Sequence, residues 1–149
     1  MSLIVQTDSL ERQVGRRLHH IGFVVSSISE TVVDFAEGVA GTWGGEVILD
    51  PLQKVRVAFI RPSGRGQEAV LFELVEPVGG NSPVDGFLRR GGGLHHVCFE
   101  VEDIEAELDS VRMRGGLMAR SPMPAAAFSG RRIAWVYTRR RLLIEYLEK

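Results

Sequence analysis

The chain repeats itself, and this repeat limits its possible folds more than any other feature of the sequence. Residues 18–28 and 94–104 align at an offset of 76 residues, and six of the eleven aligned positions are identical. Unrelated segments of this length would share about one identity. The segments 71–77 and 143–148 also align, at an offset of 72 residues. We therefore expect two tandem copies of one folding unit.

Both halves have the same predicted order of secondary structure. In the first half, β-forming runs, helical periodicity and glycine breaks predict a strand, a helix and three more strands, at 18–25, 28–39, 46–50, 54–61 and 68–76. In the second half the same order is predicted at 94–101, 103–114, 116–120, 131–137 and 141–148. The predicted fold class is therefore α+β, with tandem βαβββ modules that form a curved mixed sheet.

The repeat also predicts how the chain is organised along its length. We expect an N-terminal arm, a first module (module one), a joining segment and a second module (module two), at 1–16, 17–78, 79–92 and 93–149, with the two modules forming a single domain. Within the joining segment a short helix is expected to begin at Ser82-Pro83, because proline is well tolerated in a first helical turn. Residues 121–130 are rich in small residues and are expected to form a loop that covers a site.

Composition and charge exclude several classes of protein. The chain has 18 Lys and Arg against 19 Asp and Glu, and this near-neutral balance argues against a nucleic-acid-binding protein. Its apolar runs are much shorter than the roughly 18 residues of a membrane span, and no signal-peptide pattern is visible. A single cysteine, Cys98, allows no disulfide within the chain, which suits a reducing compartment. We therefore expect a cytoplasmic protein with neither nucleic-acid nor membrane partners.

Two histidines and two glutamates recur at equivalent positions of the repeat. Because side chains alternate along a strand, His20 and His96 should face away from the apolar residues that pack under the helices. Glu73 and Glu145 occupy the same face of the last strand in each half. With the modules related by a pseudo-twofold axis, these four side chains would converge on the concave face of the sheet. Two imidazoles and two carboxylates can hold a first-row transition metal, so the sheet is expected to surround a metal-binding cleft.

Other reactive residue types near these positions are given structural roles. By the same alternation, His19 and His95 should face the helices or pair with backbone groups. Cys98 is expected to be a small strand residue and not a nucleophile, because no catalytic dyad accompanies it.

These features resemble the vicinal oxygen chelate superfamily, and within it the methylmalonyl-CoA epimerase family. The resemblance covers roughly residues 18–148 and is most specific at 72–77, 82–84, 87–88 and 93–97. It implies a divalent transition metal (cobalt, zinc, nickel or manganese) held by the four residues His20, Glu73, His96 and Glu145. It further implies a small-molecule substrate such as an acyl-CoA thioester, and a homodimer.

The activity implied by the resemblance is that of a metal-dependent isomerase or epimerase, which abstracts a proton next to a thioester or ketone carbonyl. A divalent cation stabilises the enolate that this step forms, and carboxylates move the proton. Glu145 is implied as both ligand and acid/base, with Glu73 as the second catalytic carboxylate. The chain departs from the pattern of characterised bacterial epimerases at Val57, where those enzymes carry another glutamate, although other epimerase-like sequences also have valine there. It also departs at 137–141, where relatives have a His-Pro-Lys followed by a glycine turn.

Three other functions are compatible with this kind of fold. A glyoxalase-I-like lyase (lactoylglutathione lyase type) uses the same four ligand types, and the valine at position 57 favours it, whereas the joining segment favours an epimerase. A ring-cleaving dioxygenase would use two histidines and one glutamate on iron, and four ligands argue against it. A metal-free resistance protein would bind a small molecule without chemistry, and the intact His/Glu quartet argues against that alternative.

Overall fold

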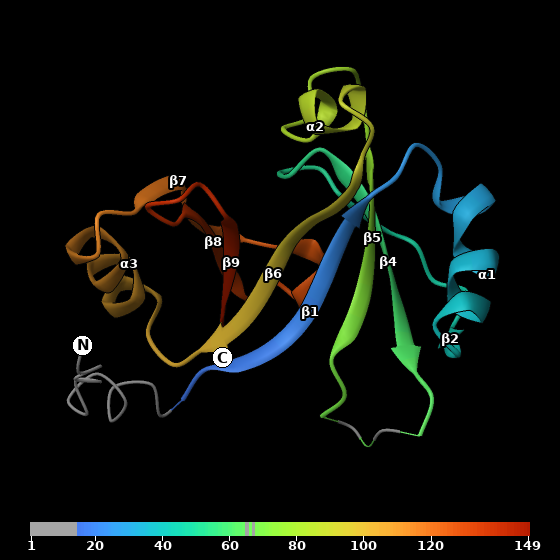
Figure 1. Ribbon diagram of the computed structural model, residues 1–149, viewed down its shortest axis with the longest axis horizontal. Helices are drawn as coiled ribbons and strands as arrows, with labels where there is room; N and C mark the ends of the chain where they lie inside the picture. The colour runs from blue at the N-terminus through green and yellow to red at the C-terminus, as the bar shows by residue number, and fades with distance from the viewer. Residues whose placement is uncertain (1–14, 65, 67) are drawn as a thin grey trace, which may run out of the picture.

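The computed structural model describes residues 15–64, 66 and 68–149. Its elements, in chain order, are β1 (Arg17–Val24), α1 (Ile28–Gly38), β2 (Gly41–Trp43), β3 (Ile48–Asp50), β4 (Val55–Pro62), β5 (Leu71–Pro77), α2 (Asp85–Arg89), β6 (Gly93–Val101), α3 (Ile104–Met113), β7 (Leu117–Pro124), the 3-10 turn η3 (Ala126–Phe128), β8 (Arg132–Tyr137) and β9 (Leu143–Glu148). Figure 1 shows α1 and α3 at opposite ends of the molecule, with β1 and β6 between them.

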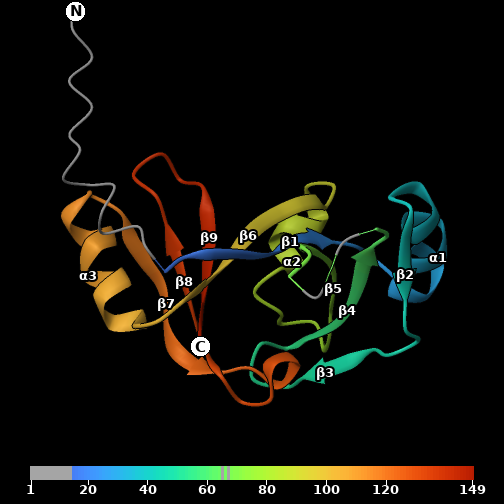
Figure 2. The same cartoon turned by 90° about the horizontal axis from the view of Figure 1, so that it is seen from below.

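All strands of the described residues belong to one curved mixed sheet. Its order is β2-β4-β5-β1-β6-β9-β8-β7, and β3 pairs with β4 beside this path. β1 is parallel to β5 and β6 is parallel to β9, whereas β1 and β6 are antiparallel to each other. The centre of the sheet is therefore the junction of the two modules, and Figure 2 shows the strands of each module curving away from it. The predicted α+β class and curved mixed sheet are confirmed.

Several details of the predicted elements were wrong, and three of them concern the strands around the site. Residues 41–43 form the strand β2, which was predicted only as a glycine-rich break, because they pair with the end of β4. β5 begins at Leu71 and not at residue 68. β7 continues to Pro124, and η3 follows it, so much of the predicted loop 121–130 is regular structure. In each case pairing with a neighbouring strand, or its absence, decided the boundary, and local composition does not report that pairing.

The two long helices begin in the same way in both modules. The side chains of Ser27 and Asp103 cap α1 and α3 by accepting hydrogen bonds from the amides of Glu30 and Ala106, at 3.3 and 3.0 Å. A glutamate at the end of the last strand then accepts from the first helical amide of each helix. Glu76 accepts from Ile28 at 2.8 Å, and Glu148 accepts from Ile104 at 3.5 Å. The repeat in sequence is thus a repeat in hydrogen bonding.

Each helix packs on the convex face of its own half of the sheet. Under α1 the buried residues are Ile28, Val32, Ala36, Ala58, Ile60 and Leu74. Under α3 they are Val101, Ile104, Leu108, Val111, Ala134, Val136 and Tyr146. Two smaller clusters, one containing Val57 and Val75 and the other Cys98 and Leu147, line the concave face. The convex face therefore supplies the core, and the concave face is left for a site.

The predicted division at 1–16, 17–78, 79–92 and 93–149 stays a prediction, and residues 1–14 of the predicted arm lie outside the described residues. Arg16, at the end of that arm, donates to Glu107 of α3 at 2.9 Å. None of the helices in the described part of the chain is long and apolar enough to cross a membrane.

Candidate metal centre

The four residues singled out by the repeat lie on four adjacent strands at the middle of the sheet. Glu73 is on β5, His20 on β1, His96 on β6 and Glu145 on β9, which is also the order of these strands across the sheet. Register places Gly22 between Glu73 and His96, and Cys98 between His20 and Glu145. All four side chains are buried, with at most 4% of the residue exposed.

The side chains of these residues converge at their tips. The Nε2 atoms of His20 and His96 are 3.2 Å apart, and Oε2 of Glu73 lies 3.3 Å from each of them. Oε2 of Glu145 lies 3.5 Å from Nε2 of His96. One nitrogen or oxygen of His20, His96 and Glu73 therefore faces a common point, and the Glu145 carboxylate adjoins it at His96. The structure brings together every residue that symmetry placed in the site.

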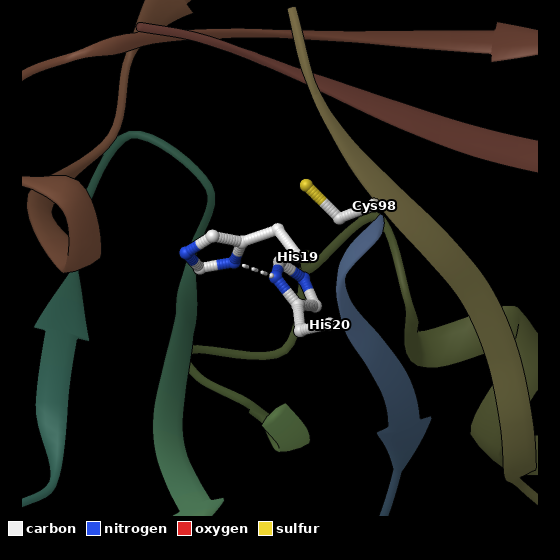
Figure 3. A group of neighbouring side chains, drawn as sticks. All are labelled: His19, His20 and Cys98. Carbon is white, nitrogen blue, oxygen red and sulfur yellow. Dashed lines mark hydrogen bonds between the residues drawn. The ribbon is translucent and has the colours of Figure 1, made fainter. Parts of the chain in front are cut away.

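Two irregularities in strand pairing place two more histidines beside this point. Between Leu18 and His20 the pairing of β1 with β6 shifts so that His19 is an extra residue, and the next shift leaves His95 extra on β6. Bulged residues break the alternation of side chains. Nδ1 of His19 lies 2.9 Å from Nδ1 of His20, as Figure 3 shows, and Nδ1 of His95 lies 2.9 Å from Nδ1 of His96. The prediction that these two side chains face the helices or the backbone was wrong.

Burial and mutual charge shift the pKa values of the cluster. Burial opposes ionisation of Glu73, but the two adjacent imidazoles outweigh it and lower the pKa of that carboxyl. Burial raises the pKa of Glu145, and the neighbouring Glu73 charge adds to the shift. Burial lowers the pKa of His20, but the Glu73 carboxylate more than offsets this and leaves the pKa raised. The thiol of Cys98 donates to Oε1 of Glu145 at 3.5 Å, and burial raises its pKa well above the ordinary value.

The donor set fits a divalent transition metal. Among the described residues, the ion pairs of Glu73 and Glu145 are to histidines alone, with no lysine or arginine reaching them. Two buried carboxylates without a permanent cation are costly to fold, and a cation at the point they share would remove that cost. Three of the four residues, His20, Glu73 and His96, offer ligand atoms within 4.8 Å of one another.

A cavity of about 580 Å³ opens over the site, with Glu73, His96 and Glu145 among the residues that line it. Two aromatic rings form its walls next to the histidines. Phe128 of η3 stacks on His20 with ring centroids 5.7 Å apart, and Trp135 of β8 lies edge-on to His96 at 4.7 Å. Sequence reasoning missed both residues. Trp135 pairs with Glu145 across β8 and β9, and strand alternation in β8 could have indicated its face, whereas for Phe128 the sequence indicated only that the segment 121–130 covers a site.

Val57 lies in this cavity wall, next to Val55 of the same strand and Val75 of β5. The nearby Asp50 also lines the cavity, but its oxygens accept from the amides of Leu52, Gln53 and Ala126 at 2.9 to 3.0 Å. Asp50 thereby joins the end of β3 to η3 of the other module. The residues of β4 that line the cavity, Val55 and Val57, are both apolar, and no side chain of this strand replaces the missing glutamate.

The fold and the site together define a class of protein. A family model described as the Glyoxalase/Bleomycin resistance protein/Dioxygenase superfamily matches residues 19–135, and the chain belongs to this family. The ethylmalonyl-CoA/methylmalonyl-CoA epimerase of Cereibacter sphaeroides is 31% identical over 127 residues, which cover 81% of this chain and 87% of that protein. The mitochondrial methylmalonyl-CoA epimerase of Mus musculus is 33% identical over 100 residues, 66% of this chain and 53% of that protein.

Solved structures agree with this assignment of the fold. The crystal structure of methylmalonyl-CoA epimerase from Mycobacterium tuberculosis has a TM-score of 0.75, at 21% identity, covering 89% of this chain and 87% of that one. A methylmalonyl-CoA epimerase in complex with methylmalonyl-CoA and NH4+ has a TM-score of 0.75, at 23% identity, covering 91% and 95%. The resemblance to the vicinal oxygen chelate superfamily, close to the methylmalonyl-CoA epimerases, is confirmed. The curated relatives support an enzyme with an epimerase-like function.

Proposed function

We propose that this protein is a metal-dependent epimerase or isomerase that abstracts a proton next to the carbonyl of an acyl-CoA thioester. The observation that carries the proposal is the buried cluster of His20, Glu73, His96 and Glu145, three of which, Glu73, His96 and Glu145, line a cavity. These four residues would hold the metal, which we infer to be cobalt, zinc, nickel or manganese. When bound, the metal would polarise the substrate carbonyl and stabilise the enolate.

We infer that the two carboxylates move the proton on two sides of the substrate. Glu73 is on β5 and Glu145 is on β9, and the two histidine strands β1 and β6 lie between them. A substrate over the histidines would therefore have one carboxylate on either side. We assign Glu145 as ligand and acid/base, with Glu73 as the second acid/base. This arrangement gives an epimerase two bases although β4 carries Val57 in its wall.

Support for a CoA thioester comes from the relatives and from charge. Both curated relatives are named as epimerases of acyl-CoA compounds. Lys54 and Arg120 line the cavity, and Arg120 is fixed by donating to Oε1 of Gln53 at 3.2 Å and to the carbonyl oxygen of Leu52 at 3.0 Å. Cations in the wall would attract an anionic substrate. A homodimer and a cytoplasmic location remain predictions.

The metal is tested first, by elemental analysis of protein purified without added metal and again after zinc or cobalt is offered. We expect about one equivalent of metal in the wild type and a large loss in His96→Ala, since each ligand contributes directly to affinity. The wild type should also unfold at a lower temperature after treatment with a chelator. A wild type that takes up no metal under either condition would contradict the proposal and favour a metal-free binding protein.

The division of labour between the carboxylates is tested by replacing each one. With (2R)- and (2S)-methylmalonyl-CoA in deuterated water, Glu145→Gln and Glu73→Gln should each invert the substrate about 10²- to 10⁴-fold more slowly than wild type at saturating metal. Each variant should still exchange the C2 proton of one stereoisomer, and the two variants should retain opposite stereoisomers. Glu102→Gln, on the exposed surface, is the control. Exchange of the same stereoisomer in both variants would show that only one carboxylate is a base.

A glyoxalase-I-like lyase is the second candidate, and the apolar wall at Val57 is the observation that favours it. It predicts turnover of the hemithioacetal of methylglyoxal and glutathione, with no proton exchange on acyl-CoA esters. Assaying both substrates with one metal-loaded preparation separates the two functions.

A further inference from the structure

The two histidines that precede His20 and His96 make the same contact in both modules. Each is the extra residue where the pairing of β1 with β6 shifts, and each brings its Nδ1 to 2.9 Å from Nδ1 of the histidine that follows it. The paired rings are close to perpendicular, at 81° for His19 and His20 and 89° for His95 and His96. The contact therefore occurs twice, through two separate bulges on two different strands.

A separation of 2.9 Å between ring nitrogens is that of an N–H···N hydrogen bond, in which one nitrogen donates and the other accepts. Nε2 of His20 and of His96 faces the common point, so a metal there requires a lone pair on that atom. The hydrogen of each ligand imidazole must then be on Nδ1. It follows that His19 and His95 accept at Nδ1 and carry their own hydrogen on Nε2.

We propose that His19 and His95 are positioning residues, which fix the tautomer and ring orientation of His20 and His96 by accepting a hydrogen bond from Nδ1 of each. This inference rests on the proposed metal centre. Hydrogen-bond partners of this kind orient metal-binding histidines and raise their basicity, and their loss typically weakens metal binding by about 10- to 100-fold.

Aromatic neighbours hold the imidazole rings of His19 and His95 in place. His95 lies edge-on to Phe87, with ring centroids 4.7 Å apart, and Trp135 is 6.2 Å away. His19 lies edge-on to Phe128 at 5.5 Å. Because His19 and His95 are not carboxylates, they add no negative charge to the centre. A divalent cation would then be balanced by the charges of Glu73 and Glu145 alone, which keeps a buried site neutral.

The first test compares zinc affinities by competition with a chelator. His19→Leu and His95→Leu remove the acceptor, and each should weaken zinc binding by about 10- to 100-fold. His19→Asn and His95→Asn place an amide oxygen near the position of Nδ1, and each should recover most of that loss. Thermal unfolding of the metal-free variants checks that they are folded. Equal affinities for the Leu and Asn variants would overturn the inference.

The second test needs no variant and reports the hydrogen bond itself. In ¹⁵N-labelled wild type, before and after zinc is added, we expect scalar coupling between the Nδ1 atoms of His19 and His20 and between those of His95 and His96, with the hydrogen on the ligand residue. Zinc binding without this coupling, or with the hydrogen on His19 or His95, would show that the positioning role is wrong. The proposed metal centre would not be affected by that result. A wild type that binds no zinc contradicts both proposals.

Discussion

Modules one and two differ most informatively two residues after each ligand histidine, where one has Gly22 and the other Cys98. Gly22 is opposite His96 in the sheet, and a Cβ on it would lie 2.0 Å from Cε1 of that ring. Cys98 is opposite His20, and its sulfur instead reaches Glu145. The ring of His96 therefore lies directly over the backbone of the other module, whereas His20 leaves room for a side chain. The two modules repeat the same sequence, but the rings of His20 and His96 therefore have different surroundings.

The largest effect should come from adding one methyl group at the glycine. Gly22→Ala forces the His96 ring out of its place, and because the ring can rotate away, the metal site should suffer more than the fold. We expect zinc affinity to fall by about 100-fold or more, with an overpacking cost of about 1–3 kcal/mol in the free energy of unfolding. Chelator competition and urea unfolding of the metal-free protein measure the two effects.

Cys98→Ala is the matched control for that substitution, because it changes the equivalent position without a clash. It removes one weak hydrogen bond to Glu145, and the unfolding free energy should fall by about 1 kcal/mol. Zinc affinity should stay close to that of wild type. If Gly22→Ala and Cys98→Ala bind zinc equally well, the close approach of the His96 ring to Gly22 does not matter for the site.

The modules also hold their helices differently. In module one, Phe35 of α1 packs against Phe23 and Phe72, at ring separations of 5.1 and 5.7 Å. Val111 of α3 occupies the position equivalent to Phe35 and contributes to the cluster under that helix. Module one thus uses an aromatic cluster where module two uses a smaller aliphatic residue.

Replacing each of these equivalent residues by alanine should show how much each packing arrangement contributes to the free energy of unfolding. Phe35→Ala should lower the free energy of unfolding by about 3 kcal/mol, the low end for an aromatic residue because Phe35 is only partly buried. Val111→Ala removes fewer buried carbons and should cost about half as much. Urea unfolding of the metal-free proteins gives both values. A larger loss for Val111→Ala would mean that α3 depends more on packing than α1 does.

Sequence alone predicted the βαβββ order, apart from the additional strand β2 of module one, and the face on which His20, Glu73, His96 and Glu145 lie, because both depend on period-two alternation and on the repeat. It failed for His19 and His95, since a bulge arises from the pairing of two strands 76 residues apart and leaves no mark on either strand. Phe128 was missed for a related reason: its contact with His20 depends on where η3 lies in space. The clustering of these four side chains was therefore predictable, and the residues around them were not.

A final contrast concerns ion pairs at the outer ends of the sheet. Among the residues that the structure describes, Arg56 of module one pairs with Glu76 alone, at 3.0 Å. Its counterpart Arg132 binds both Glu105 and Glu148, at 2.7 Å each. Glu105 is the equivalent of Ser29, so the additional carboxylate exists only in module two. Hydrogen bonds from Arg132 lower the pKa of Glu105 and of Glu148 below their ordinary values.

The pH dependence of stability should expose this difference, and it is the smallest effect expected. Carboxyls with a depressed pKa in the folded state stabilise it above the ordinary value of about 4.3, and that contribution is lost as the pH falls through the depressed values. Arg132→Gln should therefore lower the urea midpoint slightly near neutral pH, and the difference from wild type should shrink in acid. Arg56→Gln should cause a smaller change. Because these groups are at least partly exposed, salt should weaken both effects. A midpoint difference for Arg132→Gln that persists unchanged in acid would mean that the arginine acts through packing of its side chain and not through its charge.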